Sequence, residues 1–432
     1  MPAADARDTH RAIDAVWRIE SAKLIASLAR LARGDVGLAE DWAQDALMAA
    51  LQQWPAQGIP DNPGAWLMAT AKRRAIDFFR RSAMAERKHE ELGRELQIRE
   101  EADAPDVEAA ADDDIGDDLL RLVFTACHPV LSTDARVALT LRLLGGLTTD
   151  EIARAFLAPE PTIAQRIVRA KRTLADARVP YEVPRRAELA ERLASVLEVI
   201  YLIFNEGYAA TAGDDWMRPR LCEDALRLGR ILAGLMPDEP EVHGLVALME
   251  IQASRARARV GPGGEPILLL DQNRARWDQL LIRRGLAALA RAEELTEGAR
   301  GPYTLQAAIA ACHARARTAE ETDWARIAAL YGELAELLRS PVVELNRAVA
   351  VSMADGPAAG LALVDRLLAE PSLTSYHLLP SVRGDLLDKL GRHAEARAEF
   401  ERAASLTRNA RERDLLLGRA ARAASSARDA AP

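Results

Sequence analysis

The stretch from Asn62 to Arg81 predicts an amphipathic helix with an unusual polar face. Asn62 can cap this helix, and Pro63 suits its first position because proline has no N–H to lose there. At about 100° per residue, one broad apolar arc holds Leu67, Met68, Ala69, Ala71, Ala75, Ile76, Phe78 and Phe79. The opposite arc holds Trp66, Thr70, Arg73, Arg74, Asp77, Arg80 and Arg81. The chain is therefore expected to be helical here, with a basic face turned to solvent.

Trp66 is the odd member of that polar face. An indole among arginines suits a surface that binds phosphates and stacks on an unpaired base. A solvated basic face whose tryptophan is covered by the preceding loop would give the same pattern. The stretch by itself leaves both interpretations open.

The composition extends the helical prediction to the whole chain. Alanine, leucine, arginine and glutamate dominate the 432 residues, and aromatic residues make up only 4%. These residue types favour helix, so we expect an all-α protein. At roughly 150 residues per domain, the length predicts about two to four domains.

Charge is distributed unevenly along the chain. The net charge of −8 argues against nucleic acid as the main partner, but a sum over the chain hides local fields. Arginines cluster in 73–81 and 166–172, whereas acidic residues cluster in 100–118. Two basic patches separated by an acidic connector are not a random spread.

The sequence offers no metal, cofactor or catalytic constellation. Cys127, Cys222 and Cys312 are far apart and lack ligand spacing, as do the isolated histidines, so the cysteines are interpreted as buried thiols in a reducing compartment. We find neither a signal-peptide core nor an apolar run of the roughly 20 residues that span a bilayer. We expect a soluble, cytoplasmic protein that is not an enzyme, needs no cofactor and has no membrane partner.

Three segments surround the Asn62 helix. A preceding helix that starts near Leu38 places Asp41, Gln44 and Asp45 on its polar side. Residues 54–60, which begin with Trp54 and contain two prolines and a glycine, predict a loop that leads into Asn62. After the helix, residues 84–118 are acidic and alanine-rich, which predicts a linker, with a solvated acidic helix as the alternative.

Residues 119–178 have the spacing of a helix-turn-helix unit. Thr148 and Glu151 match a capping box at the start of a short helix. A second helix begins near Pro161, with Ile163, Ile167, Ala170 and Leu174 toward the core. Its outer face carries Thr162, Gln165, Arg166, Arg169 and Arg172. A polar, basic second helix is typical of the recognition helix that enters the major groove, where arginine can bond guanine and glutamine can bond adenine.

Together, the two basic units resemble bacterial sigma factors of the extracytoplasmic-function type, the promoter-recognition subunits of RNA polymerase. The run AEDWAQDALMAAL with NPGAWLMATAKRRAIDFFRR resembles the family's second conserved region, and LTTDEIARAFLAPEPTIAQRIVRAKRTL resembles its fourth. The resemblance implies a region 2 domain at 8–83, a linker at 84–118 and a region 4 domain at 119–178. Its implied partners are core RNA polymerase and promoter DNA.

The resemblance also implies residue roles. Asp41, Gln44 and Asp45 match the helix that docks on the polymerase clamp, and Trp54 lies in the loop that captures a flipped base of the minus-ten element. The helix that holds the opened strand supplies Asn62, Trp66, Arg73, Arg74, Asp77, Arg80 and Arg81. The minus-thirty-five helix supplies Thr162, Gln165, Arg166, Arg169, Lys171 and Arg172. Leu157, Pro159, Ala164 and Gln165 depart from the family's usual residues, so the resemblance does not imply a minus-thirty-five sequence.

The rest of the chain predicts two further helical domains after the prolyl segment 179–184. We expect a helical extension domain at 185–298, within which the stretch from NEGYAAT to LLLDQNRARWD resembles the extension of a subset of these factors. Residues 299–425 have the small and large positions of tetratricopeptide helix pairs, with Gly384 and Phe400 among them. We expect such a tail to bind a protein partner or to contact another part of the same chain. The alternative is a bundle of helices with a purely structural role. We hypothesise that it replaces a separate anti-sigma regulator. A polar cluster at 205–208 and 213–216 resembles a pocket, although a loop between helices explains it equally well.

Two other functions are compatible with these features. The chain can be a helix-turn-helix regulator that binds duplex DNA without polymerase and senses a ligand or a protein through its tail. It can also be a scaffold whose basic faces are only solvated. Trp66 separates the first alternative from a sigma factor, because a duplex-only regulator does not use an exposed aromatic residue on a basic helix.

Overall fold

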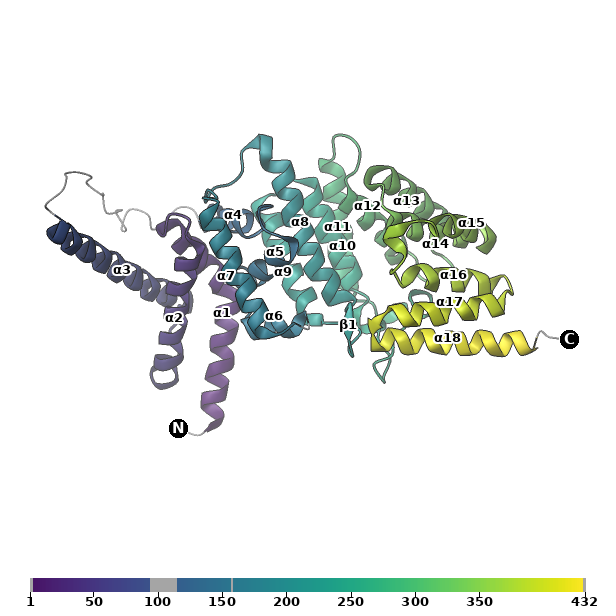
Figure 1. Ribbon diagram of the computed structural model, residues 1–432, viewed down its shortest axis with the longest axis horizontal. Coiled ribbons are helices and arrows are strands. Elements are labelled where there is room, and N and C mark those ends of the chain that lie inside the picture. The colour runs from purple at the N-terminus through teal and green to yellow at the C-terminus, as the bar shows by residue number, and fades with distance from the viewer. Residues whose placement is uncertain (1–2, 94–114, 157, 430–432) are drawn as a thin grey trace. The chain divides into compact units, whose positions relative to one another are not determined.

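The computed structural model describes residues 3–93, 115–156 and 158–429 (Figure 1). The protein is all-α, as predicted: apart from one pair of two-residue strands and a single isolated bridge, the described residues form helices, turns and loops. The chain divides into two compact units, Met1–Val199 and Ile200–Pro432. No helix in the described ranges has the length and apolarity that crossing a bilayer requires.

The first unit contains seven helices in its described residues and the start of an eighth. They are α1 (Ala3–Leu31), α2 (Val36–Gln57), α3 (Pro63–Gly93), α4 (Ile115–Ala126), α5 (Thr133–Leu143), α6 (Thr149–Ala155), α7 (Glu160–Asp176) and α8 (Arg186–Tyr208). α1 packs against α2, α3 and α4, and α7 packs against α5 and α6. The buried aliphatic residues of α1, such as Leu24, Ile25 and Leu28, therefore form the centre of the unit.

The second unit is a succession of helices that pack on their neighbours in the chain. They are α9 (Pro219–Leu235), α10 (Pro240–Ala253), α11 (Gln279–Leu295), α12 (Pro302–Arg315), α13 (Trp324–Leu338), α14 (Pro341–Asp355), α15 (Pro357–Leu367), α16 (Leu378–Lys389), α17 (His393–Leu406) and α18 (Ala410–Asp429). Short 3-10 turns lie at Ala256–Ala258, Leu269–Asp271, Arg274–Arg276 and Pro371–Leu373. The strands β1 (Ala212–Gly213) and β2 (Arg408–Asn409) pair in parallel.

The predicted loop at 54–60 is wrong at its start. α2 continues to Gln57 and includes Pro55, and Gly58 ends it with a φ of 86°. Trp54 is 2% exposed and therefore belongs to the core. Pro55 has no N–H to donate to the carbonyl of Leu51, four residues earlier, and the helix ends two residues after it.

Helices extend into both ends of the predicted linker at 84–118, whose limits stay a prediction. α3 continues to Gly93, and α4 begins at Ile115; residues 94–114 lie outside the described ranges. Asp118, the last residue of the predicted linker, is 1% exposed and forms ion pairs with Arg30 of α1 and Arg121 of α4. The hydroxyl oxygen of Tyr181 lies 2.9 Å from the Ala26 carbonyl oxygen and 3.0 Å from that of Asp118. Asp118 thus helps to join α4 to α1.

The helix-turn-helix prediction is confirmed in its local geometry. The Glu151 N–H donates to Thr148 Oγ1 at 3.1 Å, and the Thr148 N–H donates to Glu151 Oε2 at 3.0 Å, so both halves of the capping box form. The four residues predicted to face the core from the second helix, Ile163, Ile167, Ala170 and Leu174, are all buried. The helix begins at Glu160, one residue earlier than predicted.

Two of the three cysteines are buried, as predicted. Cys127 and Cys222 are buried, whereas Cys312 is half-buried. Burial raises the pKa of the Cys127 thiol to about 11 and that of Cys222 to about 12. At neutral pH these thiols are protonated, so they are packing groups and not nucleophiles.

The repeat-like pairing predicted near the C-terminus is present as helix packing. α16 packs on α17 and α17 on α18, and Phe400 of α17 is 1% exposed. A Cβ atom added to Gly384 of α16 would lie 2.9 Å from the Phe400 ring. Glycine here lets the aromatic ring reach the α16 backbone. The domain limits 185–298 and 299–425 stay predictions, as does membership of the tetratricopeptide class.

We expect Gly384→Ala to destabilise the second unit by about 1–3 kcal/mol, because the new methyl group would overpack the Phe400 ring. The matched control is Gly332→Ala in α13, where no atom lies within 4 Å of the added Cβ. That substitution should stabilise the helix by about 0.5–1 kcal/mol. Urea unfolding of the full-length variants, followed by circular dichroism, measures both effects. Equal stability of the two variants would contradict the tight contact.

Candidate nucleic-acid interface

The N-terminus of α3 forms as the sequence predicts. Asn62 Oδ1 accepts a hydrogen bond from the Ala65 N–H at 3.1 Å, and Pro63 is the first helical residue. Leu67, Ala71 and Ala75 are buried against the unit. The predicted polar residues Arg73, Arg74, Asp77, Arg80 and Arg81 are all exposed. α3 therefore carries a solvated basic face over about two turns of its described length.

The apolar arc of α3 is narrower than predicted. Ala69 is exposed, and Phe78 is 36% exposed. Phe78 and Phe79 both meet the buried Trp42 of α2 edge to face, at ring-centroid distances of 5.7 and 5.6 Å. These two contacts leave part of the Phe78 ring in water.

Trp66 is half-buried and packs on Trp54. The two ring centroids are 5.3 Å apart at an interplanar angle of 68°, an edge-to-face contact. The prediction that Trp54 reaches a flipped base from a loop is wrong for this structure, because its side chain is buried in α2. The buried Trp54 ring instead packs against the Trp66 ring. Part of that ring remains in solvent beside the arginines of α3.

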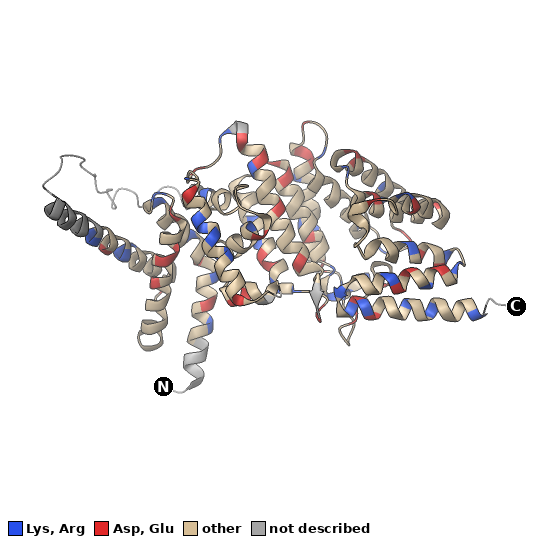
Figure 2. Ribbon diagram, in the orientation of Figure 1, with Lys and Arg blue, Asp and Glu red and all other residues tan. Residues whose placement is uncertain are grey.

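The outer face of α7 is polar and basic, as predicted. Thr162, Gln165, Arg169 and Arg172 are exposed, and Figure 2 shows Lys and Arg positions in blue along the ribbon of this helix. Arg166 forms an ion pair with Asp134 of α5 at 3.2 Å, and Arg172 forms one with Asp176 at 3.4 Å. Gln165 and Arg169 lie four residues apart and hence on one stripe of the helix.

Val168 is a residue of this stripe that the sequence analysis missed. Its side chain is 63% exposed, although valine is normally buried. It lies three residues after Gln165 and four before Arg172, so it shares their face. The helical period also places this position on the outer face in the sequence, where its apolar side chain stands among polar residues.

Comparisons with known proteins agree with this geometry. Residues 19–84 match Sigma-70 region 2, and residues 121–174 match Sigma-70, region 4. The chain carries regions 2 and 4 of an RNA polymerase sigma factor. Residues 192–293 match a family of unknown function, DUF6596. "Uncharacterized protein R00370" of Rhizobium meliloti (strain 1021) is 45% identical over 379 residues, 88% of either chain, so the two proteins belong to one family. No solved structure matches the chain.

Regions 2 and 4 meet at a buried carboxylate. Glu40 of α2 is 2% exposed, and its Oε1 lies 2.5 Å from Nε of Arg142 in α5. Its Oε2 pairs with Nζ of Lys171 in α7. Burial by itself would raise the pKa of Glu40, but the two cations outweigh it and hold that pKa below its ordinary value. The carboxylate is therefore ionised and joins three helices.

This contact changes the interpretation of Lys171. The resemblance assigned it to DNA, but in this structure its ammonium group is bound to Glu40 and points toward region 2. Glu40 itself was not among the predicted residues. It stands beside Asp41 on α2, but the helical period places it on the face of Val36 and Ala43, which are buried, so the sequence pattern does distinguish these two adjacent acids.

The three residues predicted to bind polymerase lie on α2 as expected. Asp41 and Asp45 are exposed, whereas Gln44 is half-buried and donates from Nε2 to Glu40 Oε1 at 2.5 Å. Partial burial and the neighbouring acids raise the pKa of Asp41, although Lys171 opposes the shift. Asp41 and Asp45 are accessible to a partner, and Gln44 is committed to the Glu40 cluster.

We expect Glu40→Gln to destabilise the protein by about 3 kcal/mol at neutral pH, because it leaves two cations without their buried partner. The folded-state pKa of Glu40 is depressed, so the stabilisation is present above about pH 4.5 and is lost as the pH falls through the folded value. The difference between wild type and variant should shrink in acid. Urea unfolding across this pH range measures it, with Asp45→Asn on the same helix as the control. A pH-independent difference would contradict ionic stabilisation.

Proposed function

We propose that this protein binds core RNA polymerase and directs it to promoters as a sigma factor of the extracytoplasmic-function type. The observation that carries the proposal is the occurrence, in one chain, of regions 2 and 4 with exposed basic faces on α3 and α7. The protein itself catalyses nothing; the polymerase supplies the chemistry, in the cytoplasm. The test is specific initiation on promoter DNA by purified core polymerase with and without this protein. If polymerase is not engaged but duplex DNA is bound, the stand-alone regulator is the better description.

The exposed residues support a division of roles. Asp41 and Asp45 are available to dock on polymerase, and Trp66 with the arginines of α3 suits an opened strand, because a base can stack on the indole while guanidinium groups bind phosphates. Gln165 and Arg169 on α7 suit base edges of a duplex. These assignments follow the exposure of the side chains and rest on the resemblance to the family.

Binding both promoter elements requires regions 2 and 4 to separate. The Glu40 cluster holds α2 against α7, with Lys171 turned away from the outer face of its own helix. We propose that polymerase binding breaks this cluster and frees Lys171 for a phosphate. The acidic surface of α2 and the recognition helix would then become available together.

We also propose that the second unit regulates initiation in place of a separate anti-sigma protein. Its helices form a large body beyond the two sigma regions, and it includes most of the span that matches the family of unknown function. Tyr181, Arg192 and Ser195 bond to main-chain or side-chain groups of the first unit, so a chain cut directly after Arg178 would lose part of that unit as well. Substitutions within the second unit are therefore a cleaner test than truncation.

Trp66→Ala should impair promoter opening more than duplex binding, because stacking on a base contributes about 1–3 kcal/mol only after the strands separate. Opening is measured by the fluorescence of 2-aminopurine placed in the minus-ten element, and duplex binding by anisotropy. Trp66→Phe should restore most of the loss, and Thr70→Ala on the same helix is the control. Normal opening by Trp66→Ala on a natural duplex would contradict the assigned role.

Val168→Ala should weaken binding by about 0.8 kcal/mol at a thymine of the minus-thirty-five element, since an exposed apolar side chain there suits the thymine 5-methyl group. Replacing that thymine by deoxyuridine removes only the methyl group. The wild type should lose affinity on this change, and the variant should not. Leu280→Ala in α11, another exposed apolar residue, serves as the control. Equal losses for wild type and variant would exclude the contact.

A further inference from the structure

The polar cluster at 205–216, which the sigma function does not use, lies beside a cavity in the second unit. The cavity has a volume of about 370 Å³, within the range of small-molecule sites. It is lined by the loop before α9, by the segment around the 3-10 turn Ala256–Ala258, and by the first turn of α18. Three segments far apart in the chain thus share one cavity.

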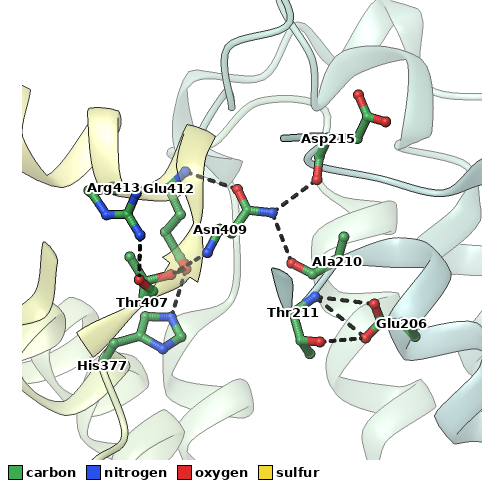
Figure 3. A network of polar contacts seen from close by, with 9 residues as sticks. All are labelled: Glu206, Ala210, Thr211, Asp215, His377, Thr407, Asn409, Glu412 and Arg413. Carbon is green, nitrogen blue, oxygen red and sulfur yellow. Dashed lines mark hydrogen bonds and ion pairs between the residues drawn. The ribbon is translucent and has the colours of Figure 1, made fainter. Parts of the chain in front are cut away.

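A buried asparagine fixes the cavity walls in place. Asn409 is fully buried, and its Nδ2 donates to the carbonyl oxygens of Ala210 at 3.0 Å and Asp215 at 2.9 Å (Figure 3). Its Oδ1 accepts from the Glu412 N–H at 3.2 Å. The β1–β2 pairing runs directly beside these bonds. The loop that carries Asp214 and Asp215 is therefore held to the start of α18 and is not merely a connector between helices.

The same loop is also tied back to α8. Glu206 pairs with Arg218 and accepts a hydrogen bond from the Thr211 hydroxyl at 2.9 Å. The guanidinium of Arg259, which is 7% exposed, lies 3.5 Å from the centroid of the Tyr208 ring and 5.6 Å from that of Trp216. Trp216 lines the cavity, and its Nε1 is buried without an acceptor among the described residues.

Charges of both signs line the cavity without pairing. Arg257 and Arg411 contribute two cations, and Asp214 and Asp215 contribute two anions. All four are exposed, and within the described ranges none of their side chains forms an ion pair or a hydrogen bond. Elsewhere in this unit arginines bind carboxylates directly, as Arg383 binds Asp365 at 2.9 Å. The cavity thus presents unpaired cations and anions next to the apolar side chains of Trp216, Met217 and Val260.

We propose that this cavity binds a small zwitterion with an apolar body, of the class of apolar amino acids and dipeptides. The guanidinium groups of Arg257 and Arg411 would bind its carboxylate, and the carboxylates of Asp214 and Asp215 its ammonium group. The apolar side chain would lie on Trp216. Because Arg411 belongs to α18 and the aspartates to the loop after α8, the ligand would bridge the two ends of the second unit. The inference stands independently of the sigma function.

The test is isothermal titration of the full-length protein with the dipeptide Leu-Leu and with L-leucine. At least one should bind saturably at one site. N-acetylation removes the positive charge of the probe that binds, and amidation of its carboxylate removes the negative charge. Each of these two changes should weaken binding about tenfold, or ~1.4 kcal/mol. Asp215→Asn and Arg411→Gln should weaken it to a similar extent. Arg402→Gln, at an exposed position of α17, should leave the affinity unchanged.

Three results would overturn the proposal: no saturable binding of either probe, equal affinity for the charged and blocked forms, or unchanged affinity in both cavity variants. The substituted side chains are exposed, so the variants should fold, and circular dichroism checks this. Should a variant unfold, the blocked probes on the wild-type protein still decide. The assay contains no polymerase or DNA, so its outcome is separate from the test of the sigma function.

Discussion

The first unit depends on one buried carboxylate. Glu40 accepts from Arg142 and pairs with Lys171, and these cations come from helices far along the chain, 102 residues later in the case of Arg142. An ionised group in a protein interior is tolerable only when opposite charges neutralise it. The contact therefore favours one arrangement of α2, α5 and α7, and it places the predicted polymerase-binding helix and the predicted recognition helix next to each other.

In the second unit, a buried side chain without a charge joins distant segments in a similar way. Asn409 replaces the ionised carboxylate with an amide that bonds to main-chain carbonyl groups, 199 residues away in the case of Ala210. An amide has both donors and acceptors, so it can join a helix start to a loop without a charge. In each unit, a buried polar side chain thus connects segments that lie far apart in the sequence.

Much of the local structure could be predicted from the sequence. The cap at Asn62, the capping box at Thr148 and Glu151, and the inner face of α7 are properties of consecutive residues, so the helical period and the cap chemistry suffice. The exposure of Arg73, Arg74 and Arg169 follows from the same period. The contact of Gly384 with Phe400 was indicated by the spacing of small and large residues.

Only the tertiary structure decided which of the predicted site residues are accessible to a binding partner. Trp54 looked like a loop residue because of the prolines after it, yet it is buried beneath Trp66. Asp118 looked like part of a solvated linker, and Lys171 like a DNA contact, but both are bound by partners from distant helices. The helical period decides only which face of its own helix a side chain lies on. It carries no information about which distant helix packs there, and that packing sets burial, charge pairing and access.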